Sequence, residues 1–128
     1  MRYLLDTHTF IWLAAKPDCL SGTALDIVAD TKNELLLSAA SGWETALLWK
    51  LNRIELPQEP ALFIPEVIAS LSLTPTPINF APAIAAATLP FIHRDPFDRL
   101  LVATALQEKI AIISKDRMLV EYGVEVVW

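Results

Sequence analysis

Residues 2–15 read RYLLDTHTFIWLAA, and this stretch changes from one kind of secondary structure to another. Residues 2–5 form a short apolar run that predicts a buried strand. Residues 10–14 then place apolar side chains at helical spacing. Asp6 stands between the two elements, so the sequence predicts an acidic side chain at the carboxyl end of the first strand.

The same alternation of strand and helix continues along the chain. ELLLS at 34–38 and IAIIS at 110–114 are continuous apolar runs of the kind found in parallel sheets, and VEVVW at 124–128 predicts a last strand. Helical patterns separate these runs, near residues 21–29, 41–51, 61–71, 79–90 and 95–109. The pattern predicts an α/β fold, a sandwich with a mostly parallel central sheet.

Composition supports a folded protein. Of the 128 residues, 54% are hydrophobic and 20% are charged, which excludes a disordered chain and predicts a single domain over residues 1–128. No apolar run reaches the roughly 18 residues that a membrane span needs. The opening MRYLLDTHTF carries a carboxylate too early for a signal peptide, so we expect a cytoplasmic protein without a membrane association.

The net charge and the numbers of cysteines and histidines limit the ligands that the protein is expected to bind. The net charge of −5 argues against a nucleic-acid partner, because phosphates are held by Lys and Arg. Several acids in one pocket would weaken that argument, since bound cations reverse the local sign. One cysteine and two histidines without ligand spacing disfavour a zinc site.

Four carboxylates stand where a predicted strand ends or a predicted helix begins: Asp6, Glu44, Asp98 and Asp116. The predicted topology brings these positions to one edge of the sheet, where ligands bind in parallel α/β proteins. A cluster of oxygen ligands suits Mg²⁺ or Mn²⁺, which can polarise a phosphate and lower the pKa of an attacking water. The sequence therefore predicts metal-assisted phosphodiester cleavage.

Each acid also has a simpler explanation. Asp6 can cap the helix that follows it. Ser41 and Glu44 have the spacing of a capping box, with an apolar stripe through Trp43, Leu47, Leu48 and Leu51 behind it. Asp98, three residues after the predicted N-cap Asp95, can form a second capping box with it. His8 either contacts substrate or simply packs.

Four segments together resemble the successive motifs of the PIN-domain ribonucleases of the VapC-type toxin group. They are LLDTHTF, SAASGWETALLWK, LPFIHRDPFDRLLVATA and IISKDRMLVEYGVEVVW, and they extend from Leu4 to Trp128. The resemblance implies a PIN-like α/β/α sandwich. It also implies that the catalytic, metal-binding acids are Asp6, Glu44, Asp98 and Asp116, with Asp95 a less certain fifth acid.

The resemblance further implies a mechanism and partners. A metal-bound water would hydrolyse RNA and leave 5′-phosphate and 3′-hydroxyl ends, with Mg²⁺ or Mn²⁺ as cofactor. Ser114, just before the last acid, would hydrogen bond at the site. Members of this group are usually inhibited by a cognate antitoxin that covers the active site, and they commonly form homodimers.

The flanking residues leave several interpretations open. Four cations lie near the motifs and could contact RNA or simply be solvated: Lys50, Arg94, Arg99 and Lys115. Tryptophans can stack on bases, but a packing role is favoured for all four. LNRIELP replaces the Gly-Lys type of turn common in relatives, so Asn52 would supply the turn and Arg53 a charge at the substrate rim.

Two alternatives remain at this point. LLDT after a first strand also resembles the opening of haloacid-dehalogenase-like phosphatases, in which Asp6 would be the nucleophile. Those enzymes have a second acid two residues later, where this chain has His8. The other alternative is a catalytically inactive PIN-like binding module whose acids serve only as helix caps.

Overall fold

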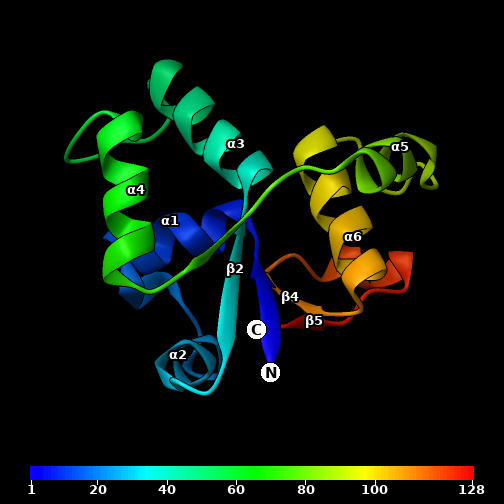
Figure 1. Ribbon diagram of the computed structural model, residues 1–128, viewed down its shortest axis with the longest axis horizontal. Helices are drawn as coiled ribbons and strands as arrows, with labels where there is room; N and C mark the ends of the chain where they lie inside the picture. Colours follow the sequence, from blue (N-terminus) through cyan, green and yellow to red (C-terminus); the bar gives the residue numbers. More distant parts are fainter.

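A computed structural model describes all 128 residues (Figure 1). It contains five parallel strands, six α-helices and two short 3₁₀-helices, labelled η1 and η2. The strands lie in the order β3-β2-β1-β4-β5, and every neighbouring pair is parallel, which confirms the predicted sandwich. In chain order the elements are β1 (Arg2–Leu5), α1 (Thr7–Ala15), η1 (Pro17–Cys19), α2 (Gly22–Ala29), β2 (Glu34–Ser38), α3 (Ala39–Lys50), α4 (Pro60–Ser70), β3 (Thr74–Thr76), α5 (Phe80–Thr88), α6 (Pro96–Glu108), β4 (Ala111–Ile113), η2 (Arg117–Tyr122) and β5 (Val126–Val127).

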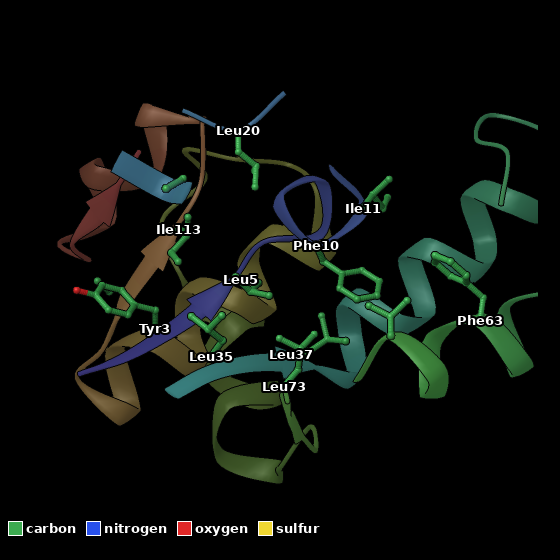
Figure 2. Close-up of a cluster of buried hydrophobic side chains, with 13 residues drawn as sticks. Tyr3, Leu5, Phe10, Ile11, Leu20, Leu35, Leu37, Phe63, Leu73 and Ile113 are labelled. Carbon is green, nitrogen blue, oxygen red and sulfur yellow. The ribbon is translucent and has the colours of Figure 1, made fainter. Parts of the chain in front are cut away.

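The two faces of the sheet carry separate cores. Tyr3 and Leu5 of β1 point to one face, where they join Phe10 of α1 and Phe63 of α4 in a cluster of 13 buried side chains (Figure 2). Leu4 points to the other face, where a second cluster includes α6 side chains. Successive strand residues alternate between faces, so one short apolar strand can serve both layers.

The carboxyl ends of the strands lie together. Asp6 follows β1, and its backbone N–H donates to the carbonyl of Ile113, the last residue of β4, at 3.2 Å. Helix α3 begins directly after β2, and it contacts both α1 and α6 (Figure 1). The starts of α1, α3 and α6 therefore meet at this edge of the sheet. None of the helices has the length and hydrophobicity that a membrane span requires.

Helix α3 differs from its prediction in two ways. The cap is Ser38, whose hydroxyl accepts a hydrogen bond from the N–H of Ala40 at 3.0 Å, so the predicted Ser41–Glu44 capping box is wrong. The predicted buried stripe is also wrong, because Trp43 is 60% and Leu51 52% exposed. The helix instead turns its polar side inward, burying Ala40, Ser41, Glu44 and Thr45.

Candidate active site

Asp6 is tied to its surroundings through both carboxylate oxygens. Oδ1 accepts a hydrogen bond from the N–H of Thr9 at 2.7 Å, which caps α1. Oδ2 accepts a hydrogen bond from the hydroxyl of Ser114. The same Ser114 oxygen accepts from the N–H of Asp116 at 3.0 Å. Ser114 thus connects the first and the last of the predicted acids, and the prediction that Asp6 caps α1 is confirmed.

Glu44 lies in the second turn of α3 and is only 9% exposed. Burial raises the pKa of its carboxyl, and a hydrogen bond from the Thr7 side chain opposes this shift. The negative charges of Asp95 and Asp6 raise the pKa further, so Glu44 lies within electrostatic reach of both. The hydroxyls of Thr7 and Ser41 are also hydrogen-bonded to each other at 3.1 Å, which joins α1 to α3 at this point.

His93, Asp98 and Asp116 form the tightest group at this edge. One ligand atom from each lies within 4.8 Å of the other two. Nε2 of His93 lies 2.6 Å from Oδ2 of Asp116 and 3.7 Å from Oδ2 of Asp98. Sequence analysis missed His93 as a site residue. The available signal was its place in HRDPFD, two residues before Asp95.

The acids of the site influence one another. Burial raises the pKa of Asp98 to about 7, and the charge of Asp95 adds to the shift. The charges of Asp6 and Glu44 act in the same direction, whereas His93 lowers the pKa of Asp98. The hydrogen bond to Asp116 raises the pKa of His93. Asp6, Glu44 and Asp98 are thus electrostatically coupled, and Asp116 acts on His93. Asp6 and Glu44 lie outside the tight group around His93.

A family model described as the PIN domain matches residues 3–125. The chain belongs to the PIN-domain family. Among curated proteins it is 31% identical over 119 residues to ribonuclease VapC22 of Mycobacterium tuberculosis strain H37Rv, a match that covers 91% of this chain and 88% of that protein. It is 34% identical over 55 residues to ribonuclease VapC16 of the same strain, covering 43% and 39% of the two chains.

Solved structures share the PIN fold of this chain. VapBC2 from Rickettsia felis, bound to a DNA fragment from its promoter, matches with a TM-score of 0.71 at 13% identity, over 100% of this chain and 99% of the other. FitAcB from Neisseria gonorrhoeae matches with a TM-score of 0.63 at 19% identity, over 98% and 96%. At these identities the likeness shows the fold, and it agrees with the predicted PIN-like sandwich.

Arg99 has a structural role in this PIN domain, because its side chain binds backbone carbonyls. It is 7% exposed, and its guanidinium donates to the carbonyls of Leu89 at 2.7 Å, Pro90 at 2.9 Å and His93 at 3.2 Å. It also reaches the carbonyl of Ala87 and the hydroxyl of Tyr122, and Phe91 covers it at 5.2 Å. The interpretation of Arg99 as an RNA contact or solvated cation is wrong, because the guanidinium is used to hold the segment that carries His93.

The remaining candidates fall at the rim. Asp95 caps α6, with Oδ1 accepting from the N–H of Phe97 at 2.9 Å, and its charge also acts on Glu44 and Asp98. Three predicted cations are exposed: Lys50, Arg94 and Lys115. The packing interpretation fails for Trp43, which is 60% exposed with its ring edge on Phe97. Trp12 and Trp128 do pack on each other, with centroids 5.8 Å apart.

The donor atoms at this edge suit a hard divalent cation. Carboxylate oxygens dominate the set, and the burial and mutual repulsion that raise the pKa of Asp98 and Glu44 would be relieved by a positive ion. A single imidazole, that of His93, lies among them. The residues present therefore fit the metal dependence of PIN nucleases.

Proposed function

We propose that this PIN domain is a metal-dependent endoribonuclease, the toxin of a VapC-type toxin-antitoxin pair. The observation that carries the proposal is the convergence of buried, coupled carboxylates at the carboxyl edge of the parallel sheet. Membership of the PIN family and 31% identity to a protein named as a ribonuclease support RNA as the substrate. His8 in place of a second acid speaks against the phosphatase alternative.

In this proposal Asp6, Glu44, Asp98 and Asp116 are the catalytic acids and hold Mg²⁺ or Mn²⁺. The bound cation supplies charge that polarises the phosphate and lowers the pKa of the attacking water. Ser114 and the Thr9 N–H fix the direction of the Asp6 carboxylate. His93 holds Asp116 in place beside Asp98. These contacts preorganise the oxygens, so little reorganisation accompanies the chemical step.

The proposal includes partners and a location. The solved neighbours are VapBC and FitAB toxin-antitoxin assemblies, which supports a cognate antitoxin for this chain. Exposed apolar side chains such as Trp43, Phe80 and Phe91 could lie in such an interface or in a homodimer. The apolar surface therefore agrees with both assemblies. We place the protein in the cytoplasm, where RNA and antitoxin are both available.

The test is cleavage of total RNA by the purified protein with Mg²⁺ or Mn²⁺, followed by sequencing of the released 5′ ends. Excess EDTA should abolish cleavage, and Asp6→Asn should do so while circular dichroism stays unchanged. Asp26→Asn, an exposed acid on α2, is the matched control and should cut normally. Full cleavage in EDTA would contradict the metal role. A wild-type protein that binds the antitoxin but never cuts RNA would favour the inactive binding module.

A further inference from the structure

A groove of about 710 Å³ lies between α1 and the loop that joins α3 to α4. Helix α1 contributes His8, Trp12 and Lys16 to its lining, and the loop contributes residues 52–57. A volume of this order is typical of sites that hold small molecules or single groups of a larger ligand. The loop takes this course partly because Asn52 adopts a left-handed conformation with φ of 57° directly after α3.

The groove begins beside the acidic site. His8, which lines it, is two residues from Asp6 on the first turn of α1. A polynucleotide with one phosphate at the acidic site could therefore extend directly into this groove.

The charges in the groove suit phosphate. Lys16 and Arg53 are exposed and take part in no ion pair, whereas the ion pairs of the protein involve Arg2 and His93. Glu55 is the one acid in the lining. Cations thus outnumber acids here, in a chain whose net charge is −5. A polyanion would be attracted to this groove more than to the surface as a whole.

An aromatic surface accompanies these cations. The ring of Trp12 is half-buried and packs on Trp128, with centroids 5.8 Å apart. The ring of His8 lies 5.9 Å from it on the groove side, inclined at 56°. Aromatic rings fixed beside cations bind single-stranded nucleic acid, because an unpaired base can stack on the ring while the phosphates meet the charges.

We propose that this groove is a subsite for single-stranded RNA adjoining the scissile phosphate, with a base on Trp12 and backbone phosphates at Lys16 and Arg53. The inference rests on the proposed ribonuclease function and adds to it the residues that hold the strand beside the cut.

The test is steady-state cleavage of one RNA by Arg53→Gln, Lys16→Gln and Trp12→Leu. Each variant should raise KM about tenfold with kcat little changed, as loss of a phosphate or stacking contact requires. Each charge removal should also lower the slope of log affinity against log salt by about 0.7, the value for single strands. Lys32→Gln, in the turn before β2 at the opposite edge of the sheet, is the matched control and should change neither quantity.

The outcomes separate the two proposals. If the wild type cuts RNA and the variants keep its KM and salt slope, the groove assignment fails and the ribonuclease assignment stands. If the variants cut normally and instead lose binding to a partner protein, the groove is a protein-docking surface, which also overturns the proposal. If the wild type neither cuts nor binds RNA, the proposed function fails, and the groove assignment fails with it. Trp12→Leu also removes core packing, so the two exposed charge variants decide the result if it misfolds.

Discussion

The starts of α1 and α6 each present an aspartate to the same edge of the sheet, but they hold it in different ways. Asp6 accepts hydrogen bonds from the N–H of Thr9 and the hydroxyl of Ser114, donors that stabilise a negative charge. Asp98 lies 3.7 Å from the His93 ring, and burial raises its pKa to about 7. Fixed hydrogen-bond donors hold the Asp6 carboxylate, whereas burial disfavours the anionic form of Asp98.

This difference indicates that the two aspartates have different roles at the carboxyl edge of the sheet. The fold sets the direction of the Asp6 carboxylate, which would be a fixed oxygen ligand in the proposed site. The ionised form of Asp98 is unfavourable until a positive charge arrives, so cation binding and ionisation of Asp98 are coupled. Removing the negative charge should therefore affect activity alike at the two positions, but affect stability in opposite directions.

The largest expected effect is on catalysis, in Asp6→Asn and Asp98→Asn. Each should lower kcat at least about a thousandfold, because the cation contributes several kcal/mol of transition-state stabilisation. In EDTA at pH 8, Asp98→Asn should raise the free energy of unfolding by about 1–3 kcal/mol, since it removes a buried charge. Asp6→Asn should lower it by about 1 kcal/mol, because the capping charge is lost. RNA cleavage and urea unfolding measure the two effects. Equal stability changes of the same sign would remove the distinction between the two aspartates.

Arg99→Lys should have the next largest effect. An ammonium has three donors on one atom and cannot reach the carbonyls of Leu89, Pro90 and His93 together. We expect a loss of about 10- to 100-fold in kcat, the range seen when groups that orient metal ligands are removed. Mn²⁺ affinity, measured by calorimetry without substrate, should fall as well.

The control for Arg99 is its exposed neighbour on the same segment. Arg94→Lys keeps the charge and makes none of these contacts, so its kcat and Mn²⁺ affinity should stay at wild-type values. Unchanged Mn²⁺ affinity in a folded Arg99→Lys protein would show that the buried guanidinium does not position the site.

A pH series in EDTA sharpens the same comparison. The folded-state pKa of Asp98 is about 7, against an ordinary value of 3.8, so between these pH values the native state holds a proton that the unfolded state has released. Stability from this group is therefore present at low pH and lost as pH rises to about 7. His93 acts in the same direction, because its raised pKa stabilises the native state at low pH.

The measurable quantity is the difference in unfolding free energy between Asp98→Asn and wild type. It should be smallest below about pH 4, where Asp98 is protonated in both the folded and the unfolded state, and should grow by a few kcal/mol as the pH rises to about 7. Taking the difference cancels the titration of groups far from Asp98. A difference that stays constant from pH 5 to 8 would contradict the raised pKa.

The two helix starts also differ in how far sequence could predict them. The α1 start follows from local rules: an apolar strand, an acidic cap and apolar residues at helical spacing. Asp95 as the cap of α6 follows in the same way. The role of His93 does not, because Asp116 lies 23 residues away and meets it only after the sheet has formed. Arg99 is similar, since its partners are backbone carbonyls, which leave no trace in the side-chain pattern.

The prediction of which side of α3 is buried failed for a related reason. Its apolar residues predicted the buried side, yet Ser41, Glu44 and Thr45 are the buried ones. If a functional site needs polar side chains in the interior, the helix must bury its polar side and expose part of its apolar side. Such conflicts with the hydrophobic pattern are expected where function constrains a fold. The exposure of the apolar residues of α3 therefore agrees with the proposed site. From the sequence alone, α3 could not be distinguished from an ordinary amphipathic helix.

The smallest effect should come from Thr7→Val, at the contact between α1 and α3. The Thr7 hydroxyl lowers the pKa of Glu44 and is hydrogen-bonded to the hydroxyl of Ser41 at 3.1 Å, and valine keeps the shape without the hydroxyl. The pKa of Glu44 should rise further, so cation binding would have to displace a proton more often. We expect Mn²⁺ affinity at pH 6 to fall about threefold, and the loss to shrink as the pH is raised to 8, because higher pH favours the ionised carboxylate in both proteins. The missing hydrogen bond should also cost about 1 kcal/mol of stability. Thr23→Val, at an exposed position on α2, is the control. A loss of affinity equal at the two pH values would mean that Thr7 acts by packing, and the start of α1 would then contribute geometry alone to the site.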